Sequence, residues 1–202
     1  DLMNENTSAT GGILSSQILP LTKGQLEDIL FSIISGITGY DEKRLFIAYQ
    51  WVPPAALKML EDWAGYFLTP APASNLPQIY HDPRGDGADV IIEEYAWLLR
   101  VSFFGPNSLS KAYELRAGLF VEQNRWDTLV PHNVEVRHVG TPLFLPYLEN
   151  LKWIHRADLE VRLTQIAKYK YAVNNILSGN GSATNDFGVN VNFDSNNARK
   201  KE

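Results

Sequence analysis

Cysteine is absent from the 202 residues of this chain. Its absence excludes disulfide bonds, zinc sites with thiolate ligands and cysteine nucleophiles. No apolar run reaches the roughly 18 residues that a membrane-spanning helix requires. No basic segment followed by an apolar one, as in a secretory leader, is visible at the start. We therefore expect no membrane association.

The sequence also lacks a recognisable catalytic or cofactor site. No Gly-x-Ser-x-Gly elbow accompanies the histidines, and no glycine-rich loop stands between a strand and a helix start to hold a phosphate. Glu93 and Glu94 cannot share a site, because adjacent residues on a strand point to opposite faces. The spacing of His81, Asp82 and Asp89 matches neither a calcium loop nor a zinc motif. We expect no catalytic residue, cofactor or metal.

A concentrated basic patch is also missing. The chain has 18 Lys and Arg against 23 Asp and Glu, a net charge of −5. Its basic residues are dispersed, apart from the short cluster Arg199-Lys200-Lys201. Proteins that grip DNA phosphates usually carry such a patch, so tight nucleic-acid binding is not expected. An acidic protein is instead suited to let DNA pass without adhering to it.

Apolar side chains are scarce at both ends of the sequence. Residues 1–17 are polar and rich in Gly, Ser, Thr and Asn, and residues 174–202 are rich in Asn, Gly, Ser and Asp. Such segments bury too little apolar surface to offset the entropy of ordering. We therefore predict a flexible arm over residues 1–17, a single domain over 18–173 and a flexible tail over 174–202.

Two long segments, residues 91–104 and 152–171, change character at every second position. This alternation predicts strands with one packed face and one hydrated face. Both exceed the usual length of ~5–6 residues, which suggests a sheet that projects beyond one core, as in proteins that build assemblies. The predicted packed faces comprise Tyr95, Trp97, Leu99, Val101 and Phe103 in the first strand, and Trp153, His155, Ala157, Leu159, Val161 and Leu163 in the second.

Two helices are predicted beside these strands. Thr22 and Gln25 form a capping-box pattern before an apolar stripe that ends near Gly39. A second helix is expected over residues 108–122, with a mostly apolar face comprising Leu109, Ala112, Tyr113, Arg116, Leu119 and Phe120. Shorter strands are expected over residues 44–51, 63–69, 78–81 and 134–138, one or two helical turns over 55–61, and a turn over 82–87. The predicted class is α+β, with a mostly antiparallel or mixed sheet, two long strands and two main helices.

The large aromatic residues could stack on bases or sugars, but such residues more often fill a core or a subunit interface. We expect the core or interface role for this set, which comprises Trp51, Trp63, Tyr95, Trp97, Trp126, Trp153 and Tyr169.

Several short motifs follow one another in a recognisable order. Residues 99–108 (LRVSFFGPNS) run from an amphipathic strand through an aromatic-Gly-Pro-Asn turn into a helix. The opening helix, an Arg44-x-x-x-Ala-Tyr-Gln strand, Pro53-Pro54 and an aromatic strand at Trp63 precede it, and residues 156–159 (RADL) lie in the last strand. Over residues 22–171 this order resembles the neck and tail terminator, or head–tail joining, proteins of tailed bacteriophages.

The resemblance implies an α/β structural protein without catalytic activity, located at the neck of the virion and assembled in the host cytoplasm. Such proteins form a ring, usually of six subunits, that caps the tail tube and docks to the head connector. The implied partners are other copies of the chain, the tail tube protein and the connector or adaptor protein, with the tail sheath as a further candidate. Genomic DNA would pass through the lumen without specific binding.

Candidate interface residues follow from the hydrated strand faces. Arg156, Asp158, Glu160 and Arg162 alternate in sign and could meet complementary charges on a neighbouring subunit, although the same residues could simply be solvated. Trp153, Glu94 and Arg100 complete the candidate set. Two other readings remain open: another ring component, such as a tail tube or connector adaptor protein, and a small enzyme of unknown substrate.

Overall fold

The computed structural model describes residues 5–48, 61–72, 76–149, 151–176, 178–184 and 190–196. The chain divides into two compact units. Unit 1 comprises Asp1–Ile18, Ile79–Ile91 and Tyr169–Glu202, and unit 2 comprises Leu19–Gln78 and Ile92–Lys168.

A mixed sheet forms the framework of unit 2. Its strands follow the order β1 (Leu45–Ile47), β2 (Trp63–Ala71), β4 (Ala88–Phe104), β9 (Arg156–Tyr171) and β5 (Val134–Val139). β1 runs parallel to β2, whereas the β2–β4 and β5–β9 pairs are antiparallel. β3 (Gln78–Asp82) also pairs with β4, and β6 (Leu143–Phe144) pairs with β9. The described strands therefore confirm the predicted α+β class and the two long strands.

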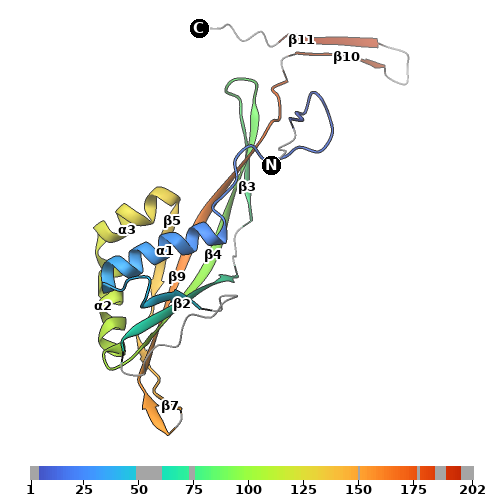
Figure 1. The fold of residues 1–202 in the computed structure, drawn as a ribbon. Coiled ribbons are helices and arrows are strands. Elements are labelled where there is room, and N and C mark those ends of the chain that lie inside the picture. The colour runs from blue at the N-terminus through green and yellow to red at the C-terminus, as the bar shows by residue number, and fades with distance from the viewer. Residues whose placement is uncertain are drawn as a thin grey trace. The chain divides into compact units, whose positions relative to one another are not determined.

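Helices cover one side of this sheet (Figure 1). They are α1 (Lys23–Thr38), α2 (Ser108–Phe120) and α3 (Glu122–Thr128), which is followed by the 3₁₀ turn η1 (Val130–His132). The core between the two layers includes Leu30 and Ile34 of α1, Leu115 of α2, Phe103 of β4 and Leu159 of β9, all nearly inaccessible to solvent. The helical stripe and the alternating strand faces thus meet in one core.

The predicted start and end of α1 are confirmed. The N–H of Gln25 donates to Thr22 Oγ1 over 3.3 Å, and the N–H of Thr22 donates to Gln25 Oε1 over 2.9 Å. Gly39 ends the helix in the left-handed region, with φ 71°, and its N–H donates to the Ser35 carbonyl. A capping box and a C-terminal glycine satisfy backbone groups that the helix itself leaves unpaired.

The predicted face of α2 is wrong in part. Tyr113 and Phe120 are 48% and 55% exposed, whereas Leu115, which was not predicted, is fully buried. The buried positions Ser108, Ala112, Leu115 and Leu119 follow helical spacing, and Tyr113 and Phe120 each lie one position after a buried residue. The helix also ends before residue 122, because Val121 adopts an extended conformation and separates α2 from α3.

The predicted strand over residues 152–171 is two strands. β8 (Lys152–Ile154) pairs with β7 (Tyr147–Glu149) in a hairpin, and β9 begins after His155. Trp153 is 69% exposed and His155 is exposed, so the packed face predicted for them is wrong. The break changes which residues face the core: Ile154 is buried before it, and Ala157, Leu159, Val161 and Leu163 are buried after it.

Three sequence segments build unit 1. Within residues 5–18, Ser8 N donates to Ala172 O over 2.9 Å and Gln17 N donates to Lys170 O over 2.7 Å. The predicted turn between β3 and β4 is confirmed, with positive φ at Gly85 and Gly87. Further along the chain, β10 (Ser178–Thr184) and β11 (Asn190–Asn196) form an antiparallel hairpin that was not predicted.

Some predictions lie outside the described residues. These are the second half of the strand over residues 44–51, nearly all of the helical turns over 55–61, and the environment of Trp51. The division into an arm, a domain and a tail also remains a prediction.

Candidate assembly surfaces

The sheet face opposite the helices carries ion pairs between strands. Arg100 on β4 donates from Nε to Glu160 Oε1 on β9 over 2.9 Å, and its Nη2 binds the same oxygen. The Arg100 guanidinium also lies 5.5 Å from the ring centre of Phe67, its register partner on β2. Phe67, Arg100 and Glu160 therefore form one row across three strands, held by charge pairing and a cation–π contact.

A second group surrounds Arg156. Its Nε and Nη2 donate to Asp158 Oδ1 and Oδ2, each over 2.8 Å, and Nη2 also donates to Ser102 Oγ over 3.3 Å. The guanidinium lies 5.6 Å from the ring centre of Phe104. Asp158 was predicted on a hydrated face, but its side chain is only 11% exposed. Bidentate pairing with Arg156 explains why a carboxylate is tolerated there.

Glu94 belongs to a third group, centred on Arg137 of β5. Arg137 lies 3.8 Å from Glu94 and 3.0 Å from Glu135, and its Nε donates to Thr164 Oγ1 over 3.2 Å. This group was not predicted from the sequence, because its members come from three different strands.

The structure thus brings five predicted interface residues into pairs within a single copy: Arg100 with Glu160, Arg156 with Asp158, and Glu94 with Arg137. Arg162 is exposed and has no ion pair in the described part of the chain. Trp153 lies apart from the ion pairs, on the β7–β8 hairpin. A role for these residues toward a second copy remains a prediction.

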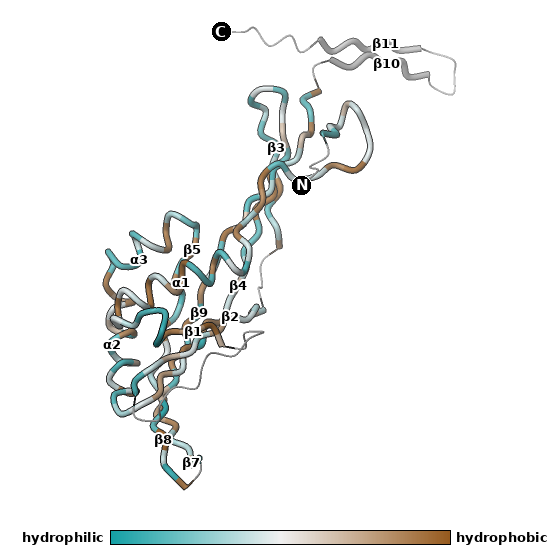
Figure 2. Tube along the Cα trace, in the orientation of Figure 1, coloured by the Kyte–Doolittle hydropathy of each residue, from teal (hydrophilic) through white to brown (hydrophobic). Residues whose placement is uncertain are grey.

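The β7–β8 hairpin carries exposed apolar side chains. Leu148 and Trp153 are register partners across its two strands, and they are 55% and 69% exposed. Leu151, in the turn, is 93% exposed and has a φ of 61°, which is unusual for any residue other than glycine. Figure 2 shows hydrophobic (brown) positions alternating with hydrophilic (teal) ones along this hairpin. Within the part of the chain that the structure describes, these side chains remain largely uncovered.

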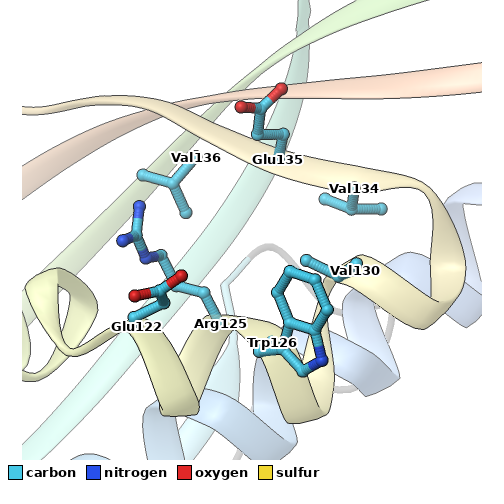
Figure 3. A pocket seen from close by; sticks show the side chains of 7 residues that line it. All are labelled: Glu122, Arg125, Trp126, Val130, Val134, Glu135 and Val136. Atoms are coloured by element: carbon cyan, nitrogen blue, oxygen red, sulfur yellow. The ribbon is translucent and has the colours of Figure 1, made fainter.

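A groove lies between α3, η1 and the start of β5 (Figure 3). Its cavity has a volume of about 190 Å³ and is lined by Trp126, Val130, Val134 and Val136 with the charged residues Glu122, Arg125 and Glu135. Trp126 is 62% exposed at its mouth, and Arg125 Nε is buried without an acceptor in the described part of the chain. Trp126 was predicted in a core or interface; its exposure excludes the core of this unit. The groove itself was not predicted, because α3 has too few apolar residues to stand out as an amphipathic helix.

His81 and its neighbours form a hydrogen-bonded cluster in unit 1. His81 Nδ1 lies 2.8 Å from Asp89 Oδ1, and His81 Nε2 lies 2.8 Å from Asn175 Oδ1. Asp82 instead binds Arg84, whose hydrogen bonds lower the Asp82 pKa to about 2. Among the residues that the structure describes, no group of three or more His, Asp or Glu could hold a metal ion.

The comparison with protein families decides between the possible classes. The family model described as phage neck terminator protein matches residues 24–188, most of the chain. The chain belongs to the phage neck terminator family. It is therefore a structural protein of the phage neck and a component of the virion that contacts other head–tail proteins. A search of curated proteins finds no match.

Membership of the neck terminator family confirms the resemblance inferred from residues 22–171. In the described part of this neck terminator protein, no helix is long and apolar enough to cross a membrane.

Proposed function

We propose that this neck terminator protein forms a closed ring, most simply of six copies, that caps the tail tube and docks to the head connector. The observation that carries the ring is the pair of uncovered apolar surfaces, the β7–β8 hairpin and the α3–β5 groove. Two different surfaces on one subunit are what a heterologous contact requires, and such contacts close into rings when the rotation between neighbours closes.

Termination by such a ring is geometric. One face matches the last ring of the tail tube, and the other face lacks the surface that a further tube subunit would need. Addition of tube subunits therefore stops, and the second face is available to the connector. The tail sheath is a further candidate partner.

The ion pairs on the sheet face would contribute little net charge to a contact with a neighbouring copy. Arg100, Glu160, Arg156 and Asp158 are already paired, so they would present fixed, nearly neutral rows to a neighbour. Arg162 is the member of the predicted set that retains an uncompensated charge within the described part of the chain. The net charge of −5 would keep a DNA-containing lumen from adhering to the genome.

The oligomeric state tests the proposal most directly. Native mass spectrometry of the full chain is expected to give one closed species of about six subunits, and electron microscopy is expected to show single rings. Phage lacking the protein should have tails of uncontrolled length, or separate heads and tails. A strictly monomeric chain, or normal infectious particles without it, would contradict the proposal.

Electron microscopy also tests the second candidate, a tail tube or connector adaptor protein. A tube protein expressed alone polymerises into long cylinders, whereas a terminator remains as single rings.

A further inference from the structure

We propose that the β7–β8 hairpin of each copy docks at the α3–β5 groove of the next copy, with the Trp153 ring in the cavity and Leu148 and Leu151 packed against its rim. This inference rests on the proposed ring and assigns the contact that closes it. The tests below separate the failure of this assignment from the failure of the ring.

The hairpin has the properties of an inserting element. Leu148 and Trp153 lie side by side on one face and are mostly exposed. A positive φ is uncommon for any residue other than glycine. Leu151 nevertheless has a φ of 61°, and 93% of its surface is exposed. A strained backbone that places a leucine in solvent points to a use for that side chain outside its own subunit.

The groove has properties that complement the hairpin. Its apolar lining from Trp126, Val130 and Val136 can receive an aromatic or aliphatic side chain. Its volume of about 190 Å³ suits a single ring, since a cavity of roughly 150 Å³ is known to hold benzene. Arg125 Nε is buried at this groove and has no acceptor among the described residues, and an inserted backbone carbonyl would supply one.

The charges near the two surfaces leave the inserting face uncharged. Lys152 is the register partner of Glu149, and this pair lies on the hairpin face opposite Leu148 and Trp153. Glu122 and Asp127 are exposed beside Trp126 and have no ion pair among the described residues, so they border the groove rather than line its apolar part. The face that meets the groove is therefore apolar.

The position of the two surfaces identifies a second copy as the occupant. The hairpin and α3 lie at opposite ends of unit 2 (Figure 1), so a chain cannot fill its own groove. Each copy instead offers one hairpin to a neighbour and one groove to another. A chain of such contacts has two different ends until it closes into a ring.

Paired single-residue variants test this contact in the full-length protein. Trp153→Ser disables the hairpin, and Trp126→Ser disables the groove. Each is expected to raise the concentration at which rings dissociate by at least tenfold, measured by native mass spectrometry and sedimentation. Leu76→Ser is the matched control, because Leu76 is 89% exposed on a different segment, and it should leave the rings unchanged.

Mixing the two variants gives a sharper result. A hairpin variant retains its groove, and a groove variant retains its hairpin. One intact contact can then form between them and no further copy can add. The mixture should therefore give a heterodimer but no ring, whereas each variant alone should be monomeric. Unchanged thermal unfolding midpoints of the monomeric variants would show that both still fold.

Three outcomes would contradict the assignment or the ring. Rings that persist in both Trp153→Ser and Trp126→Ser would overturn the assignment while leaving the ring in place. Intact rings that no longer bind the tail tube would assign the hairpin to that partner and also overturn it. A monomeric parent protein would overturn the proposed function itself.

Discussion

At the scale of single residues, His81 holds the segment after β9 against the β3–β4 turn. Its partners are both oxygen acceptors: Asp89 Oδ1 and Asn175 Oδ1, each 2.8 Å away. The orientation of the Asn175 amide is fixed independently, because its Nδ2 donates to the carbonyls of Pro83 and Gly85 over 3.1 Å. Both ring nitrogens of His81 must therefore donate, which requires the protonated imidazolium.

Two hydrogen bonds raise the pKa of His81 above its ordinary value. The bond to Asn175 has the larger effect, and the bond to Asp89 has the next largest. Because the pKa is higher in the folded protein, this contribution to stability is complete below the unfolded-state pKa. It is lost as the pH rises through the folded-state pKa. Amide exchange at Asn175, whose N–H donates to Asp86 O, should therefore accelerate over that pH range. NMR titration of His81 with hydrogen exchange measures both effects.

The matched variants are Asn175→Ala and Asn174→Ala. The first removes the acceptor and should lower the His81 pKa. The second retains the backbone hydrogen bond from Asn174 to Ser8 and should leave the pKa unchanged. A His81 that titrates at or below the ordinary value in the parent protein would contradict the assignment.

The two arginine–carboxylate pairs on the sheet face should differ in their contribution to stability. The Asp158 side chain is 11% exposed, and the Glu160 side chain is 46% exposed. Asp158→Asn should lower the free energy of unfolding by about 1–3 kcal/mol, because it removes a nearly buried carboxylate charge that accepts two hydrogen bonds from Arg156. Glu160→Gln should lower it by less than about 1 kcal/mol, since exposed pairs contribute little. Urea unfolding of dilute protein compares them, and equal losses would argue against the difference in burial as the cause.

At the scale of elements, the contact between α1 and α2 depends on Gly118. A Cβ added there would lie 2.5 Å from Ile37 Cγ2, whereas one added at Gly36, on the exposed side of α1, meets nothing within 4 Å. Gly118→Ala should therefore destabilise the fold by about 1–3 kcal/mol through overpacking. Gly36→Ala should stabilise it by about 0.5–1 kcal/mol, because alanine loses less backbone entropy in a helix. Thermal or urea unfolding of both variants checks the prediction, and a stabilising Gly118→Ala would contradict it.

Elements with local signals could be predicted from the sequence. The capping box and apolar stripe of α1 and the alternation within β4 depend on residues close together in the chain. The break at His155 could not be predicted from the sequence. Apolar and polar residues continue to alternate across it, although one strand ends at Ile154 and the next begins at Arg156. Likewise, the residues that α2 buries are not all among the most apolar ones in its sequence. Packing against α1 and the sheet determines which side chains of α2 are covered.

At the scale of the whole molecule, the assembly surfaces depend on contacts between distant segments. The charges on the last strand were predicted as a set, but their pairing was not, because Arg100 and Glu160 are 60 positions apart. The groove beside Trp126 combines a short polar helix with an edge strand, and neither has a sequence motif for binding. Family membership, by contrast, was predictable, because it depends on the order of motifs rather than on their packing.

The discontinuous composition of unit 1 has a consequence for biosynthesis. Asn174 N donates to Ser8 Oγ across 166 positions, and unit 1 includes residues from three separate parts of the chain. On the ribosome, all segments of unit 2 have been synthesised by Lys168, but those of unit 1 have not. The first segment of unit 1 can therefore find its partners only after the segment that follows Lys168 has been synthesised, so unit 1 should be the slower of the two to form.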